Sequence, residues 1–250
     1  MHDVIILAGG KMEEEFRALY DVEHKAYIPL HGKMMVQYVL EALSGVQELS
    51  RKVLVAPSLP VPPLVGEHVD HAVTGGSSMV ASLRAGLEAL PSPSEKVLVM
   101  PSDIPLLTAG AVEEFLRGCR ERQGSVCYAY VEKSDSERSY PGLRHTYARL
   151  REGTFCGGSL VLLEPAVFPQ CERLFTTLTA ARKNPFQSAS MLGLPIILKF
   201  AAGLLSLADL EKKITALLGA PAVAVRIRQG NAAFNIDDLE VLRFAERLLA

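Results

Sequence analysis

The sequence contains few cysteines, and they show no pairing pattern. Only four occur among 250 residues, and no two form a CxxC pair. Such a set offers neither the ligand spacing of a zinc site nor the dense framework of a small disulfide-stabilised domain. The N-terminus lacks the basic stretch, apolar segment and cleavage site of a secretion signal. We therefore expect a protein of the reducing cytoplasm.

A long uninterrupted apolar run and an excess of positive charge are also missing. The most apolar stretch, residues 192–207, is interrupted by Pro195, Lys199 and Gly203, which predicts packed helices and no membrane span. The formal net charge is -2, which provides no extended basic surface for nucleic acid. Any anionic substrate must therefore be bound by locally placed lysine, arginine or metal.

Two common catalytic patterns are absent as well. No pair of histidines is spaced i, i+4, and neither serine nor cysteine occupies a G-x-S-x-G turn. These absences argue against zinc-dependent hydrolysis and against covalent catalysis.

The first half of the chain alternates apolar strand-like runs with segments of helical periodicity. The runs lie at 4–8, 52–56, 96–100 and 125–131, and the helical segments at 34–44, 77–90 and 108–121. This alternation predicts an α/β fold with a mostly parallel, Rossmann-like sheet flanked by helices. Residues 57–66 contain four prolines and predict a loop.

The pattern changes in the second half. Residues 132–153 are polar, and 144–151 alternates with 154–163 as an antiparallel pair would. Residues 164–218 predict a helical insert, followed by a short strand near 221–227 and a closing helix through Leu249. We expect a single domain over 1–250, with an antiparallel excursion near 132–163.

Two glycine turns are candidate binding loops. The first predicted strand ends in Leu7, Ala8, Gly9 and Gly10, and a sharp turn there leaves backbone N–H groups free to hold phosphate. It lacks the spacing of a dinucleotide loop or a P-loop, so alone it is equally typical of a tight turn. A second turn has small residues that suit close approach by a flat base: Gly75, Gly76 and, one helical turn later, Ser82. Ser77 or Ser78 is expected to cap that helix, and for Ser77 capping is the preferred role.

Charged residues stand near the predicted strand ends. Lys25 precedes a short apolar strand and could place its ammonium against a phosphate, although a solvated lysine is the simpler interpretation of it alone. Asp103 follows a buried strand at the edge where open α/β sheets bind ligands, and Thr108 is the better cap for the next helix. Asp237 could join Asp103 on Mg²⁺ or favour the N-terminal dipole of the last helix, the role expected for Asp238.

Taken in order, these segments resemble the MobA-like nucleotidyltransferase family. This GT-A-like group includes molybdenum-cofactor guanylyl- or cytidylyltransferases and sugar- or polyol-phosphate cytidylyltransferases. The resemblance runs from Leu-Ala-Gly-Gly through the Lys25 segment, Gly-Gly-x6-Leu-x-x-Gly-Leu and Pro-Ser-Asp-Ile-Pro-Leu to Asn-Ile-Asp. It implies a nucleoside triphosphate, CTP or GTP, and a small phosphorylated or hydroxyl acceptor, with release of pyrophosphate. It also implies Mg²⁺ as cofactor and is compatible with a homodimer.

The resemblance assigns roles to individual residues. The triphosphate would be held by Leu7, Ala8, Gly9, Gly10 and Lys25, the base by Gly75, Gly76 and Ser82, and Mg²⁺ by Asp103 and Asp237, with Lys25 and Asp103 as the catalytic pair. The family places Ser or Thr, Arg and Gly soon after the first two glycines, whereas residues 11–17 here read KMEEEFR. Two interpretations stay open: Lys11 or Arg17 replaces the arginine, or the acidic run forms a helix that faces solvent.

Two other functions remain as alternatives. A GT-A-type glycosyltransferase would use a nucleotide sugar, but Ser102-Asp103 is not the Asp-x-Asp motif common in those enzymes. A non-catalytic nucleotide-binding regulatory protein would explain the altered 11–17 segment. In residues 182–205, Arg182 or Lys183 could meet an anionic acceptor, although packing is the favoured interpretation.

Overall fold

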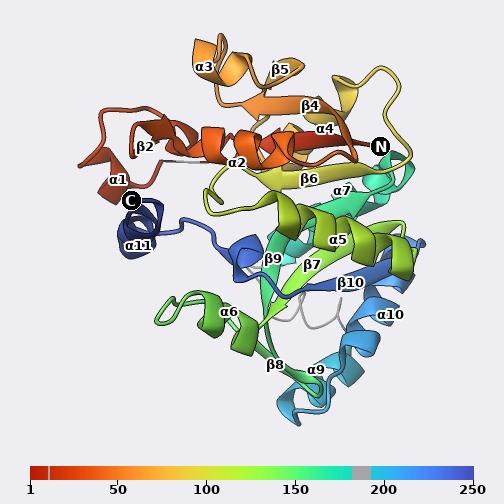
Figure 1. The fold of residues 1–250 in the computed structure, drawn as a ribbon. Helices are drawn as coiled ribbons and strands as arrows, with labels where there is room; N and C mark the ends of the chain where they lie inside the picture. The colour runs from red at the N-terminus through yellow and green to blue at the C-terminus, as the bar shows by residue number, and fades with distance from the viewer. Residues whose placement is uncertain (11, 182–192) are drawn as a thin grey trace.

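The computed structural model describes residues 1–10, 12–181 and 193–250, and its largest feature is one mixed β-sheet. Within these residues the sheet has the order β10-β7-β9-β6-β1-β4-β5, with β8 paired to β9 (Figure 1). The strands are β1 (His2–Leu7), β4 (Leu49–Ala56), β5 (His71–Thr74), β6 (Val97–Pro101), β7 (Val126–Glu132), β8 (Ala148–Leu150), β9 (Gly153–Leu163) and β10 (Ala222–Ile227). β5, β4, β1 and β6 run parallel, whereas β9 is antiparallel to all three of its partners, β6, β7 and β8.

Helices cover both faces of the sheet, as the strand–helix alternation predicts. The longer ones are α2 (Met35–Ser44), α4 (Met79–Glu88), α5 (Ala109–Arg122), α7 (Phe168–Ala181), α9 (Leu194–Ala201), α10 (Leu207–Leu218) and α11 (Leu239–Leu249). Alternate residues of β1 point to opposite faces. Val4 and Ile6 pack in one core with α2 and α5, whereas Ile5 packs in another with α4 and Phe168. The apolar run of β1 is therefore buried on both sides.

Short elements connect this framework. They are α1 (Glu14–Arg17), η1 (Lys25–Tyr27), β2 (Pro29–Leu30), β3 (Lys33–Met34), α3 (Pro63–Gly66), α6 (Lys133–Ser139), η2 (Pro165–Val167) and η3 (Gly230–Ala233). The blue α11 lies beside the red α1 segment, although the two are far apart in sequence (Figure 1). A core that joins Phe16 and Ile28 to Phe234 and Leu242 holds them together. This packing brings the last part of the chain to the first glycine turn.

Several local predictions are confirmed and others are wrong. Leu150 pairs with Gly153 where β8 turns into β9, as predicted. The predicted loop at 57–66 ends in α3, because a proline at a first helical position costs no hydrogen bond. The strand β5 and the helix α6 were not predicted, since four and seven residues carry too little periodicity. No described helix is long and apolar enough to cross a membrane.

The helix caps follow from which side chain reaches the free N–H groups. Thr108 accepts a hydrogen bond from the amide of Ala111, as predicted. Asp238, predicted to favour the N-terminal dipole of the last helix, is the N-cap of α11. Of the two candidate caps of α4, Ser78 is the observed one, because it has the extended backbone and its hydroxyl accepts from the amide of Ala81. The capping role preferred for Ser77 is therefore wrong.

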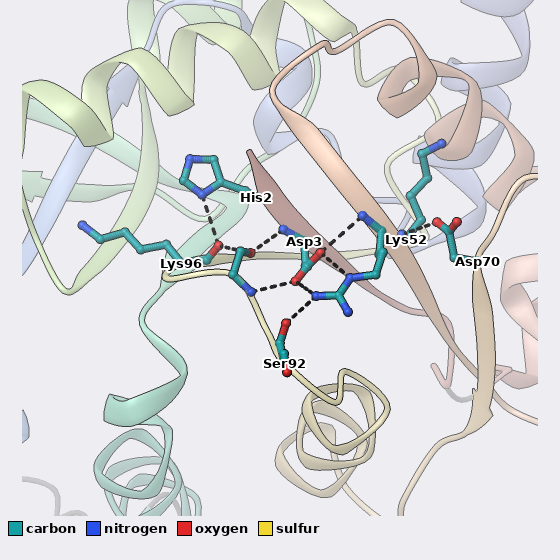
Figure 2. A network of polar contacts seen from close by, with 8 residues as sticks. His2, Asp3, Lys52, Asp70, Ser92 and Lys96 are labelled. Atoms are coloured by element: carbon teal, nitrogen blue, oxygen red, sulfur yellow. Dashed lines mark hydrogen bonds and ion pairs between the residues drawn. The ribbon is translucent and has the colours of Figure 1, made fainter.

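The end of the sheet opposite the candidate site is held by a buried carboxylate, Asp3 (Figure 2). It accepts hydrogen bonds from Arg51 Nε at 3.0 Å, Arg51 Nη2 at 2.7 Å and the amide of Ser94 at 2.8 Å. Burial alone would raise the pKa of Asp3, but the hydrogen bonds from Arg51 and Ser94 outweigh it and lower the pKa. Asp3 thus ties the start of β1 to β4 and to the loop before β6.

Candidate active site

The carboxyl ends of the parallel strands bring both glycine turns and Asp103 to one edge of the sheet. Leu7 at the end of β1 lies opposite both Val55 of β4 and Pro101 of β6. The amide of Ser102 donates to the carbonyl of Leu7 at 3.1 Å, so the chain that leads to Asp103 leaves the sheet beside the first glycine turn. Parallel strands place their ligand-binding loops at this edge.

The two glycine turns face each other across a cavity. Its volume is about 270 Å³, and it is lined by Gly9, Gly10, Met12, Arg17, Glu23, His24, Pro57, Gly75 and Gly76. Neither Leu7 nor Ala8 is among these residues, because their side chains belong to the strand and the core. Because glycine carries no Cβ, a ligand in the cavity can approach the backbone of both glycine turns closely.

Ser82 is placed behind the second turn. Its hydroxyl accepts a hydrogen bond from the amide of Gly76 at 3.1 Å, and the residue is only 6% exposed. A Cβ on Gly75 would lie 3.0 Å from that oxygen, closer than side chains normally approach. Ser82 therefore supports the shape of the turn, and the glycines provide the cavity surface.

Lys25 and Asp103 form an ion pair next to the cavity. Lys25 Nζ lies 2.9 Å from Asp103 Oδ2, and the two side chains are 7% and 21% exposed. The Lys25 ammonium also lies 5.9 Å from the centre of the Phe16 ring. Because His24 lines the cavity and Lys25 follows it directly, the ion pair and the cavity are adjacent parts of one site.

The Asn-Ile-Asp segment meets Asp103 from the other side. The amide of Ile236 donates to the Asp103 carbonyl at 2.9 Å, and Asn235 Nδ2 donates to Asp103 Oδ1 at 3.4 Å. Asp237 keeps an exposed surface, yet the surrounding protein removes enough hydration to raise its pKa. The negative charge of Asp103 adds to this rise, and Lys25 opposes it. Asp237 thus shares the electrostatic environment of the ion pair.

Two polar residues of this cluster were missed by sequence reasoning. Asn235 belongs to a motif noted in the sequence but was assigned no role, and its amide contacts Asp103 directly. Ser159 lies on β9, where its hydroxyl donates to Asn235 Oδ1. The only signal near Ser159 is the preceding pair Gly157-Gly158, which marks an irregular strand.

The unusual segment after the first glycine turn forms α1. Glu14 and Glu15 are exposed and Phe16 is buried, so the acidic side chains face solvent. Arg17, the last residue of α1, lines the cavity. Lys11 and the segment that contains Arg182 and Lys183 lie outside the described residues.

The donor atoms suit a hard divalent cation bound together with a substrate. Asp103 and Asp237 carry carboxylate oxygens, and within the described ranges no group of three or more His, Cys, Asp or Glu side chains is placed to hold a metal ion. Mg²⁺ typically takes one or two carboxylates and completes its shell with water and substrate phosphates. The residues therefore fit Mg²⁺ that arrives with a phosphorylated ligand, but not a cage made only of protein atoms.

Comparison with known proteins agrees with this arrangement of the sheet. The MobA-like NTP transferase domain matches residues 4–191, and the chain belongs to this family. A structure described as a hypothetical transferase from Thermus thermophilus is 33% identical, with a TM-score of 0.83, and the match covers 96% of this chain and 99% of that one. None of the curated proteins compared with the chain matches it.

More distant structures share the fold. The 4-diphosphocytidyl-2C-methyl-D-erythritol synthase of Anaerococcus prevotii is 14% identical, with a TM-score of 0.62 over 99% of this chain and 97% of that one. Molybdopterin-guanine dinucleotide biosynthesis protein A of Archaeoglobus fulgidus is 15% identical, with a TM-score of 0.54 over 99% and 98%. The mostly parallel mixed sheet flanked by helices is therefore the GT-A-like fold expected from the sequence.

Proposed function

We propose that this protein is a Mg²⁺-dependent nucleotidyltransferase that transfers a nucleoside monophosphate from a triphosphate to a small phosphorylated or hydroxyl acceptor. The observation that carries the proposal is the 2.9 Å pair of Lys25 and Asp103 beside a cavity walled by two glycine turns. CTP and GTP are the first triphosphates to test, because the family includes cytidylyl- and guanylyltransferases. Asp103 and Asp237 are the proposed Mg²⁺ ligands, because both carry carboxylates and the charge of Asp103 acts on Asp237.

The glycine turns and Arg17 bind the nucleotide in this proposal. Backbone N–H groups at Gly9 and Gly10 approach the phosphates closely, because neither residue has a side chain in the way. Arg17 lines the same cavity and adds a guanidinium suited to phosphate oxygens. The exposed Glu14 and Glu15 lie on α1 and do not line the cavity.

Lys25 stabilises the charge that develops on the α-phosphate. Its ammonium has three protons and donates one hydrogen bond to Asp103, which leaves donors for a phosphate oxygen. The acceptor oxygen forms a bond to the α-phosphorus as the bond to the β-phosphate oxygen breaks, and pyrophosphate leaves with that electron pair. Mg²⁺, when bound, neutralises phosphate charge. Catalysis then rests on positioning and electrostatics, without a covalent enzyme intermediate.

The test is pyrophosphate release with each of four nucleoside triphosphates and a panel of phosphorylated and hydroxylated acceptors. Asp103→Asn should lower turnover about 100-fold or more, the usual loss when one preorganised electrostatic group is removed. Asp70→Asn is the matched control, because Asp70 accepts from the amide of Lys52 at the far end of the sheet and asparagine can still accept there (Figure 2).

Three outcomes would contradict the proposal. Folded Asp103→Asn with near-wild-type turnover would remove the carboxylate from the mechanism. Release of a nucleoside diphosphate from a nucleotide sugar would indicate glycosyl transfer instead. Calorimetric binding of nucleotides without pyrophosphate release from any combination would indicate a regulatory binding protein.

A further inference from the structure

A chain of hydrogen bonds leads from β9 to the Asp103 carboxylate. Ser159 Oγ donates to Asn235 Oδ1, and Asn235 Nδ2 donates to Asp103 Oδ1 at 3.4 Å. Lys25 Nζ occupies the other carboxylate oxygen at 2.9 Å. Both carboxylate oxygens of Asp103 therefore have a hydrogen-bond partner. The partner of Oδ1 is the side-chain amide of Asn235, which Ser159 holds in turn.

The strand β9 departs from regular pairing at Ser159. Tyr128 of β7 lies opposite Val161 and Tyr130 lies opposite Gly157, so a single β7 residue, Ala129, faces residues 158–160 of β9. A Cβ on residue 158 would lie 2.7 Å from the Ala129 Cβ, which only glycine avoids. Bulges of this kind redirect side chains and are common beside active sites. The irregular pairing surrounds the residue whose hydroxyl reaches Asn235.

The hydrogen-bonding chemistry determines the direction of each bond. A carboxylate only accepts, so Asn235 must present its amino group to Asp103 and its carbonyl oxygen to Ser159. The Ser159 hydroxyl must then donate. Without it the Asn235 oxygen loses its partner, and the amide is free to rotate away from Asp103.

We propose that Ser159 is a positioning residue for Asp103 and acts through Asn235. This inference rests on the proposed function, because it takes Asp103 to be the carboxylate that binds the cation. Ser159 is not among the residues that line the cavity; its bond to Asn235 keeps the amide plane of Asn235 aligned, so that one Asp103 oxygen stays fixed. Loss of the hydroxyl should therefore weaken cation binding and slow turnover while the affinity for nucleotide changes little.

The experiment compares Ser159→Ala, Ser159→Thr, Asn235→Ala and the double variant Ser159→Ala/Asn235→Ala. Ser44→Ala is the matched control, because it also removes a hydroxyl that makes a hydrogen bond. Ser44 Oγ donates to the carbonyl of Leu40 at 2.9 Å within the distant helix α2. The measurements are Mn²⁺ binding by electron paramagnetic resonance with Mn²⁺ and pyrophosphate together as the probe, kcat and KM for the triphosphate, and the side-chain amide resonances of Asn235.

Ser159→Ala should lower kcat and weaken Mn²⁺ binding each by about fivefold, the effect of one lost hydrogen bond, with KM for the triphosphate changed by less than about twofold. It should also shift the Asn235 amide resonances, which Ser44→Ala leaves in place. Ser159→Thr retains a hydroxyl, so its kcat and Mn²⁺ affinity should stay much closer to wild type than those of Ser159→Ala. In the Asn235→Ala background, Ser159→Ala should cause no further loss.

Equal losses from Ser159→Ala with and without Asn235 would overturn the inference, and so would unshifted Asn235 resonances in that variant. These outcomes are distinct from failure of the proposed function. If the wild-type protein releases no pyrophosphate from any triphosphate, the proposed activity is wrong, whereas the Asn235 resonances and Mn²⁺ titration still test the role of Ser159.

Discussion

Replacing Lys25 by methionine should separate stability from activity. The Lys25 side chain is 7% exposed and its partner Asp103 is 21% exposed, so the pair is largely desolvated. Methionine has a similar length and suits the contact with Phe16, which lies 5.9 Å from the Lys25 nitrogen. Replacing both partners of a buried pair by apolar groups is often neutral or stabilising, whereas removing one partner costs about 3–5 kcal/mol when the remaining charge is left buried and uncompensated.

The expected change in stability is small because Asp103 retains other support. Its carboxylate still accepts from Asn235 and keeps contact with solvent, so it is not left as an isolated buried charge. We expect the free energy of unfolding to change by less than about 1 kcal/mol. For a chain of this size that corresponds to about 2–4 °C in Tm, measured by scanning calorimetry.

Activity should respond very differently. Without the ammonium, the proposed α-phosphate site loses a cation that stabilises its developing charge, and pyrophosphate release should fall about 100-fold or more. Lys33→Met is the matched control, because Lys33 pairs with Glu41 at 2.8 Å on the exposed side of α2 and should leave both turnover and Tm close to wild type. Near-wild-type turnover of Lys25→Met would refute the catalytic role, and a fall in Tm beyond about 10 °C would refute the energetic reasoning.

Three further results are expected. Asp3→Ala removes hydrogen bonds from Arg51 and Ser94 and should lower the free energy of unfolding in urea by about 3 kcal/mol. Because folding lowers the pKa of Asp3 from 3.8, this difference from wild type should be full above pH 3.8 and shrink as the pH falls below it through the folded pKa; a constant difference would contradict it. Gly86→Ala places a Cβ 2.7 Å from Ile5 Cγ2 and should cost about 1–3 kcal/mol in urea unfolding without altering KM, so an unchanged midpoint would count against it. Excess EDTA should abolish pyrophosphate release and added Mg²⁺ should restore it, whereas EDTA-resistant release would exclude the cation from the reaction.

The regular elements were predictable where the local pattern is strong. In β1 the residues Val4, Ile5 and Ile6 are fully buried, as an unbroken apolar run in a parallel sheet requires. The antiparallel direction of β9 between β6 and β7 was not predictable in the same way. β9 pairs with strands that lie far from it in sequence as well as with β8, and no local signal in 153–163 encodes those partners.

In the candidate site, too, local sequence predicted the residues, whereas the contacts between them depended on packing. The residue types and their positions near strand ends predicted Lys25, Asp103 and the glycine turns, because local sequence shows where a buried strand stops. Contacts between distant residues depended on packing. Lys25 and Asp103 are 78 positions apart, and Ser159 and Asn235 are 76 apart.

By itself, therefore, the sequence determined which segments become buried strands and amphipathic helices, since these depend on periodicity within a few residues. The tertiary structure alone decided that α11 packs against the α1 segment. The chain that leads into α11 then lies beside Asp103, where Asn235 donates to its carboxylate and Asp237 is affected by its charge. The tertiary structure also decided that irregular pairing in β9 turns Ser159 toward Asn235. Such contacts form only when the whole apolar core closes, so their geometry is a property of the packed chain and of no single segment.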